Sequence, residues 1–278
     1  MARRAAAARK RRQIQAGIAA AVALVLVVLG GWWLVSEFSG SNPGKGNKKN
    51  SADGPKTPGP CKYKEMPEKE RKKAKERKDV GTPKAGAEAR KGVRMLTMNT
   101  NRGAITIELD AAKAPCNTES LSYLASKKFY DGSSCHRLTD QGLFVLQCGD
   151  PSGTGKGGPT YTVNDENLPI GENPAYPKGA VAMANSGPDT NGSQFFIIYK
   201  DTQLDANYTL VGEVTAGLDI VEKVAKAGHD GSMDQSAGGG KPKKPVDIKT
   251  ATVTPAQPKG QASPAPEKPK ASTEPSKS

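Results

Sequence analysis

The chain is short of histidine and of aromatic side chains, which limits the chemistry it can perform. Only 2 of its 278 residues are histidine, and aromatic residues make up 5% of the sequence. His136 and His229 lie far apart, and no His/Cys spacing is typical of a zinc site. The sequence therefore indicates no metal site.

Motifs for nucleotide binding and covalent catalysis are also missing. The sequence GTGKGG at residues 153–158 is similar to a phosphate loop, but Gly157 stands where Ser or Thr should follow Lys156. Asp150 also occupies the place of the first glycine of that motif. Ser193 lies in Asn-Gly-Ser-Gln-Phe, which lacks the second glycine of a nucleophile elbow. We therefore predict no cofactor and no covalent nucleophile.

The net charge of +13 is distributed unevenly along the chain. Residues 1–15 carry +6, residues 37–91 carry +8 and residues 251–278 carry +2, whereas residues 92–250 carry −3. A nucleic-acid-binding fold should carry its basic residues on the folded domain. The distribution disfavours nucleic acid as a partner.

One long uncharged hydrophobic run occupies residues 16–36. At about 1.5 Å per residue it spans roughly 30 Å, the core of one bilayer. Trp32 and Trp33 lie at its far end, and six cations precede it, which predicts a cytoplasmic N-terminus and an external remainder. The sequence thus predicts a single-pass protein of the cell membrane, anchored in the lipid bilayer. A cleaved signal peptide is the alternative.

The segments on either side of the central part read as linkers. Residues 37–91 are rich in Gly, Pro, Lys and Ser, which predicts a flexible basic tether. The charged run 68–78 could form a helix through charge pairing but has no apolar face, so we interpret it as a solvated spacer. Attraction to anionic envelope polymers or lipid headgroups is the alternative interpretation. The Pro/Lys/Ser-rich tail at 254–278 should be disordered.

Residues 92–253 are long enough to form one folded domain. The alternating residues 105–109 and the preceding 95–98 predict a hairpin around Asn101 and Gly103. A short helix should begin near Pro115, with Asn117 as its N-cap, and a second should carry the apolar stripe of residues 220–225. The apolar run 195–198 predicts a buried strand. The pattern favours a β-barrel or sandwich with helical covers.

Three segments in this domain together resemble one family. His136-Arg137 opens a stretch that ends FVLQCGD at residues 144–150, and a Gly-rich loop with Gly157-Gly158 follows. The block MANSGPDTNGSQFF at residues 183–196 is the most specific part. The domain resembles a cyclophilin, a peptidyl-prolyl cis–trans isomerase, and the whole chain resembles the membrane-anchored cyclophilins of actinobacteria. The resemblance implies a mainly β fold, a closed eight-stranded antiparallel β-barrel capped by two α-helices.

The resemblance also implies the functional residues. Arg137 matches the catalytic arginine of the family. The positions that match the proline pocket and the peptide groove are Phe144, Val145, Gln147, Ala184, Asn185, Gln194, Phe196, Leu204 and Tyr208. We expect the protein to accelerate isomerisation of X–Pro bonds during the folding of exported proteins. A non-catalytic chaperone or binding module for proline-containing segments is the alternative.

The sequence departs from the family pattern at three places. Gln203 stands where many eukaryotic members have tryptophan, and Tyr208 stands at the usual pocket histidine. Two extra residues separate Arg137 from Phe144. Because of Gln203 we expect cyclosporin to bind only weakly.

All four cysteines lie on the predicted external side, where disulfides persist. Four cysteines allow three pairings. The family resemblance places Cys135 and Cys148 on paired strands, so that a bridge between them is sterically feasible, and Cys61 with Cys116 would then pin the tether to the barrel. Four free thiols packed as small hydrophobes are the alternative.

Overall fold

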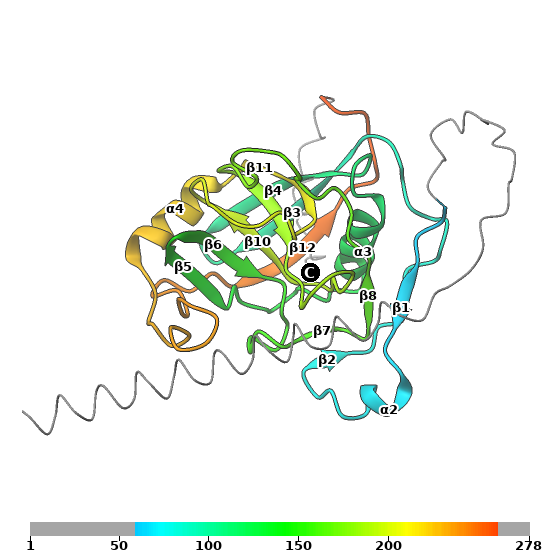
Figure 1. Cartoon of the computed structure of the whole chain (residues 1–278), viewed down its shortest axis with the longest axis horizontal. Helices are drawn as coiled ribbons and strands as arrows, with labels where there is room; N and C mark the ends of the chain where they lie inside the picture. Colours follow the sequence, from blue (N-terminus) through cyan, green and yellow to red (C-terminus); the bar gives the residue numbers. More distant parts are fainter. Residues whose placement is uncertain (1–58, 261–278) are drawn as a thin grey trace, which may run out of the picture. The chain divides into compact units, whose positions relative to one another are not determined.

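An eight-stranded antiparallel sheet forms the centre of the fold (Figure 1). Its order is β12-β3-β4-β11-β9-β10-β6-β5. The strands are β3 (Val93–Thr100), β4 (Gly103–Asp110), β5 (Arg137–Gln141), β6 (Leu143–Cys148), β9 (Ala180–Met183), β10 (Phe195–Ile198), β11 (Leu210–Ala216) and β12 (Ile248–Val253). The mainly β class expected from the sequence is therefore confirmed.

The computed structural model describes residues 59–260. The predicted basic tail (1–15), the predicted anchor (16–36), the first part of the tether and residues 261–278 lie outside this part. Between residues 59 and 260, no helix has the length and apolar character needed to cross a bilayer.

The hairpin expected from the sequence is formed by β3 and β4. Thr97 lies opposite Thr106, and Leu96 lies opposite Ile107. Ile105, Ile107 and Leu109 are fully buried, while the residues between them are partly exposed. This alternation places every second side chain in the core, as the period of a strand requires.

Two helices cover the sheet, as predicted. Helix α3 (Pro115–Ser126) contacts β12, β4 and the short strand β8 (Tyr161–Val163), and α4 (Leu218–Ala227) contacts β4 and β5. Asn117 is not the N-cap of α3, because the helix already begins at Pro115 after Ala114. The Glu166 carboxylate instead accepts hydrogen bonds from the backbone N–H groups of Cys116 and Asn117. A distant loop therefore supplies the hydrogen-bond acceptor for the free backbone N–H groups in the first turn of this helix.

The sheet is curled, but its hydrogen-bonded ladders do not close into a full barrel. Strands β12 and β5 are its two edges. Isolated bridges join Leu138 to Gly240 and Ser134 to Asp247, so the segment leading into β12 spans the gap. The expected closed barrel is thus replaced by an eight-stranded curled sheet, because only isolated bridges, and no continuous ladder, connect its two edges.

Residues 59–92, which we call the arm, form an ordered part of the folded body. The arm contains β1 (Tyr63–Glu65), α2 (Glu68–Arg71) and β2 (Arg77–Lys78). Strand β1 pairs with β8 (Tyr161–Val163), and β2 pairs in parallel with β7 (Gly158–Pro159), so the arm lies along one side of the sheet (Figure 1). The prediction of a flexible tether is wrong for this stretch, and only four residues of the predicted spacer are helical.

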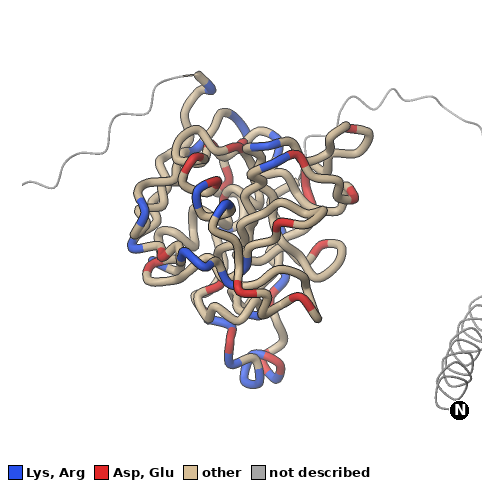
Figure 2. Tube along the Cα trace, turned by 90° about the vertical axis from the view of Figure 1, so that its left-hand side faces the viewer, with Lys and Arg blue, Asp and Glu red and all other residues tan. Residues whose placement is uncertain are grey.

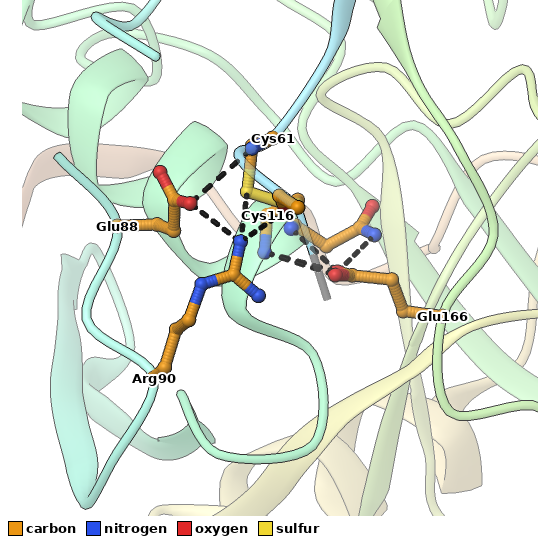
Figure 3. A network of polar contacts seen from close by, with 7 residues as sticks. Cys61, Glu88, Arg90, Cys116 and Glu166 are labelled. Atoms are coloured by element: carbon orange, nitrogen blue, oxygen red, sulfur yellow. Dashed lines mark hydrogen bonds and ion pairs between the residues drawn. A yellow bond between two sulfur atoms is a disulfide. The ribbon is translucent and has the colours of Figure 1, made fainter. Parts of the chain in front are cut away.

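The arm is fastened by a disulfide and by hydrogen bonds instead of by a large apolar face. Cys61 and Cys116 form a disulfide between the arm and α3 (Figure 3). Beside it, Glu88 Oε1 accepts hydrogen bonds from the backbone N–H of Cys61 at 3.2 Å and from Arg90 at 2.5 Å. Arg90 also donates to the carbonyl of Gly59 at 2.7 Å. Apolar periodicity could not predict this order, because the arm adds only a few apolar contacts to these polar ones, among them those of Tyr63 and Val80 with the core.

The other end of the domain also extends beyond the predicted boundary. Val93 exchanges two backbone hydrogen bonds with Gln257, at 2.8 and 2.9 Å. Residues 254–257 therefore continue along the edge of β3, and the domain does not end at residue 253.

Charged residues of both signs are interspersed over the described surface, with a dense basic group around α2 at the lower end of Figure 2. The arm to residue 91 contributes twelve basic and six acidic residues. Part of the positive charge assigned to a tether therefore belongs to the folded body.

Candidate active site

A row of four side chains crosses the sheet on its outer face. The strand registers place Arg137 opposite Gln147, Gln147 opposite Phe196, and Phe196 opposite Ala182. Since alternate residues of a strand share a face, Val145 lies on the same side of β6 as Gln147. Three segments far apart in sequence thus meet at one place.

A pocket opens above this row. Its lining residues are Arg137, Leu143, Val145, Gln147, Ala184, Asn185, Phe196, Leu204 and Tyr208. Eight of the ten predicted site residues therefore meet here: the predicted catalytic residue and seven predicted binding residues. Apolar side chains form the floor, whereas Arg137, Gln147 and Asn185 are polar. Such a pocket suits a small apolar ring flanked by a peptide bond.

Phe144 does not line this pocket. It faces away from Val145, with its ring 6.0 Å from that of Tyr199 and under the ammonium group of Lys200 at 4.5 Å. Leu143 occupies the pocket in its place. Strand alternation accounts for the exchange: Leu143 lies two residues before Val145 and shares its face, whereas Phe144 is adjacent to Val145 and points to the opposite face.

Phe196 and Tyr208 line the pocket, and the ring of Tyr176 packs behind them. Phe196 and Tyr208 pack edge to face at 5.4 Å, and both contact Tyr176. The buried hydroxyl of Tyr176 donates to the carbonyl of Tyr208 at 3.0 Å and accepts from its N–H at 2.9 Å. Burial raises the pKa of Tyr176 to about 12, so its hydroxyl stays protonated. Sequence reasoning missed Tyr176 because it lies in a loop outside the three motifs.

Arg137 is held by three acceptors. Nη1 donates to Gln147 Oε1 at 3.0 Å, Nε donates to the carbonyl of Gly238 at 2.9 Å, and Nη2 donates to the carbonyl of Ala237. The loop before β12 therefore orients the guanidinium. Nothing in the sequence of residues 237–238 indicated this role, because the acceptors are backbone carbonyls, which every residue has.

No carboxylate within the described residues forms an ion pair with Arg137. Burial lowers the pKa of Arg137, and the nearby Tyr208 acts in the opposite direction. A guanidinium nevertheless remains charged at neutral pH. The pocket thus presents a positive charge that the protein does not neutralise by direct pairing.

Gln194 extends the polar row to the Gly-rich loop. Gln147 Nε2 donates to Gln194 Oε1 at 2.8 Å, and Gln194 Nε2 donates to the carbonyls of Gly155 and Gly157 at 3.0 and 2.9 Å. Gln194 itself lines an adjoining pocket and not the one above Phe196. Its amide therefore links the position of Arg137 to this loop.

The Gly-rich loop wraps around a carboxylate of its own chain. Asp150 accepts hydrogen bonds from the N–H groups of Ser152, Gly155 and Gly157 at 2.7, 2.6 and 3.1 Å. Burial would raise the pKa of Asp150, but these hydrogen bonds and that of the Ser152 hydroxyl together keep it below its ordinary value. A side chain at Gly157 would collide with Asp150. The loop therefore cannot also bind phosphate with these donors.

Both histidines have structural surroundings. His136 is 4% exposed, and burial lowers its pKa, with Asp150 opposing the shift. His229 Nε2 lies 3.1 Å from Asp140 Oδ1 with the side chain 11% exposed. Most of the His229 side chain is therefore shielded from solvent.

The second disulfide lies next to the site. Cys148 is the last residue of β6, and it is bonded to Cys135, two residues before β5 begins. Both pairings considered for the sequence are present, and no free cysteine lies in the described residues. The bridge joins the two strands that carry Arg137 and Gln147.

A family model described as cyclophilin type peptidyl-prolyl cis-trans isomerase/CLD matches residues 95–253. The chain belongs to the cyclophilin family. The match covers the curled sheet except Val93 and Arg94, helices α3 and α4 and every residue of the pocket, while the whole arm to Gly92 lies outside it. The arm is thus an addition to the cyclophilin domain that the family model describes.

Similar proteins carry related names. A probable peptidyl-prolyl cis-trans isomerase B of Mycobacterium tuberculosis is 39% identical over 205 residues, which cover 69% of this chain and 62% of that protein. Its Mycobacterium leprae counterpart is 45% identical over 143 residues, 48% of each chain. This chain therefore spans less than two thirds of these relatives.

A solved structure has a similar fold. The crystal structure of a Cryptosporidium parvum cyclophilin type peptidyl-prolyl cis-trans isomerase in the presence of the dipeptide Ala-Pro matches with a TM-score of 0.50 and 27% identity. The match covers 58% of this chain and 99% of that chain.

Proposed function

We propose that the protein is a peptidyl-prolyl cis–trans isomerase that uses Arg137 to stabilise the twisted prolyl amide. The observation that carries the proposal is the orientation of an unpaired guanidinium at the rim of an apolar pocket. An apolar pocket alone would support binding of proline, whereas an oriented charge beside it supports catalysis.

The chemistry follows from the amide bond. Resonance opposes rotation about X–Pro with a barrier of about 18–20 kcal/mol. In the twisted transition state the prolyl nitrogen becomes pyramidal and gains a lone pair. A donor that reaches this nitrogen stabilises the twisted state more than either planar state and so lowers the barrier.

Arg137 has donors to spare for this role. A guanidinium carries five N–H groups, of which three donate to Gln147, Gly238 and Ala237. One N–H on each Nη nitrogen remains for the substrate. Phe196, Val145 and Leu143 would hold the proline ring while the preceding carbonyl rotates. A thousand- to million-fold acceleration requires about 4–8 kcal/mol, which positioning and one preorganised charge can supply without a cofactor.

Exchange NMR on an Ala-Pro peptide tests the proposal. We expect Arg137→Ala to lower kcat/KM by about 10²–10³-fold, the usual cost of removing a donor to a transition-state charge. Arg102→Ala is the matched control, since Arg102 lies on the β3–β4 turn and donates to the Pro245 carbonyl. Equal rates for wild type and Arg137→Ala would remove Arg137 from catalysis.

A non-catalytic binding module remains the second candidate. The pocket would also serve a protein that only holds proline-containing segments. If wild type binds the Ala-Pro peptide in an NMR titration but does not accelerate exchange, the binding module replaces the enzyme. We expect cyclosporin to bind weakly in either case, because Gln203 is exposed outside the pocket.

We further propose that the isomerase works outside the cell membrane on exported proteins, held by residues 16–36. Two disulfides in the folded body support an oxidising compartment. Membrane fractionation with external protease digestion tests this placement. Release of a chain that lacks its first residues would instead support a cleaved signal peptide.

A further inference from the structure

The pocket that Arg137 lines adjoins a second pocket. The two share Gln147, Ala184 and Asn185 in their linings. A peptide seated in the first pocket would therefore pass directly into the second, since an extended residue advances about 3.3 Å. The second pocket is placed to receive a side chain near the proline.

The arm supplies one wall of this second pocket. Arg77 of β2 lies in the lining, held by the parallel pairing of β2 with Gly158 and Pro159 of β7. Its Nη1 donates to the carbonyl of Pro159 at 3.0 Å. Arg77 precedes the segment matched by the family model, so this contribution is specific to a chain that carries the arm.

Arg77 is the one charged residue among the residues that line the second pocket. The others are glycine, alanine or neutral polar residues. No carboxylate of the described residues lies within 4.0 Å of its guanidinium, and the neighbouring Asp79 is already paired with Arg71. The nearby Asp150 is fully buried under the loop and occupied by its own hydrogen bonds.

We propose that Arg77 makes this isomerase prefer peptides with an acidic side chain a few residues from the proline. The inference rests on the proposed function. A Glu or Asp carboxylate in the second pocket would accept charge-assisted hydrogen bonds from the free donors of Arg77. A lysine at the same position would be repelled. Because Arg77 is partly exposed, the preference is moderate and falls with salt.

The selection should be confined to this pocket. Arg77 also lines a third hollow between the arm and β8, whose other charged residues are of both signs: Lys64, Glu65, Glu70 and Asp189. A mixed lining of this kind does not favour one charge. The arm therefore selects at one position rather than along its whole length.

Peptides that differ in one charge test the inference. Each peptide contains a central Ala-Pro, and its other residues are uncharged except at one variable position. That position carries Glu, Gln or Lys and is one of the three residues before the alanine or one of the three residues after the proline. NMR titration gives the Kd of each peptide, and exchange NMR gives its kcat/KM. At low salt we expect at least one position at which wild type binds the Glu peptide about three- to tenfold more tightly than the Lys peptide.

Arg77 variants decide whether this residue is the cause. Arg77→Gln should abolish the Glu/Lys preference, and Arg77→Glu should reverse it. Lys75→Gln is the matched control, since it removes one charge from the same segment outside the pocket lining and should keep the preference. An NMR spectrum that retains the dispersion of wild type shows that each variant is folded.

The outcomes separate this inference from the proposed function. Equal Kd values for Glu and Lys peptides at every position, or a preference unchanged in Arg77→Gln and Arg77→Glu, would overturn it. If no peptide is isomerised but the preference in Kd depends on Arg77, the catalytic proposal fails and the charge selection stands.

Discussion

At the scale of single residues, the site depends on side chains that fix other side chains. Gln147 and Gln194 never need to touch the proline, yet they connect Arg137 to the Gly-rich loop. Tyr176 holds the backbone of Tyr208 in the same way. Such supporting residues contribute measurably to the free energy of unfolding, because each forms hydrogen bonds to polar groups that would otherwise lack a partner.

Tyr176→Phe should destabilise the protein by about 1–3 kcal/mol, since the buried hydroxyl makes two hydrogen bonds to the backbone of Tyr208. Urea unfolding measures the loss. Tyr130→Phe is the matched control, because Tyr130 is equally buried but makes one hydrogen bond of 3.4 Å. Equal losses in the two variants would contradict the role given to Tyr176.

His136 should make stability depend on pH between about 5.5 and 7. Burial lowers its pKa in the folded state, whereas the unfolded chain titrates near 6.5. The unfolded state therefore binds more protons in this window, and the free energy of unfolding falls as the pH falls, by at most about 1 kcal/mol.

Urea unfolding of wild type and His136→Phe at pH 5.5 and 7 measures this effect. The variant should lose less stability than wild type on acidification. An equal fall in both would assign the pH dependence to other groups.

At the scale of the elements, helix α3 begins against a carboxylate from a remote loop. Glu166 accepts from two backbone N–H groups of its first turn and from the side-chain amide of Asn117. A capping pattern local to the sequence could not reveal this contact, because the acceptor lies about fifty residues along the chain.

Glu166→Ala should lower the free energy of unfolding by roughly 2 kcal/mol, because a charged acceptor at a helix N-terminus is lost. Thermal or urea unfolding measures it. Glu172→Ala removes an exposed carboxylate of the same loop region and should change stability by less than about 0.5 kcal/mol. Similar values for the two would show that the cap contributes little.

The elements also show what the sequence could and could not predict. The β3–β4 hairpin, the strand at 195–198 and helix α4 follow apolar periodicity, and the structure confirms them. Eight of the ten site residues that the resemblance implied line one pocket, and Gln194 lines the adjoining one. Phe144 lies outside the first pocket because adjacent residues of a strand point to opposite faces, and Phe144 is adjacent to Val145.

At the scale of the whole molecule, the arm is the main difference between expectation and structure. Its composition resembles a linker, and its order comes from strand pairing, the Cys61–Cys116 bridge and the Glu88–Arg90 pair. No periodic signal encodes contacts with partners so distant in sequence. The arm also brings a net charge of +6, up to residue 91, onto a domain whose residues 92–250 carry −3.

Replacing Cys61 and Cys116 by alanine should cost about 4 kcal/mol of stability, because the bridge closes a loop of 55 residues. The same change at Cys135 and Cys148, separated by 13 residues, should cost about 3 kcal/mol. Urea unfolding compares the two. Hydrogen exchange should also rise within residues 59–91 in the first variant alone.

Alkylation without reductant, followed by mass spectrometry, checks that both disulfides are formed in the wild-type protein. No cysteine of the folded wild type should be labelled. Four labelled cysteines would exclude both bridges.

The Cys61–Cys116 bridge has a practical consequence for anyone who isolates the catalytic domain. A fragment limited to residues 95–253, which the family model matches, would lack Cys61 and leave Cys116 as a free thiol at the start of α3. In air, such fragments should cross-link into covalent dimers that reductant dissolves. They would also lack Arg77, so their peptide preference should differ from the one proposed above for the chain that carries the arm.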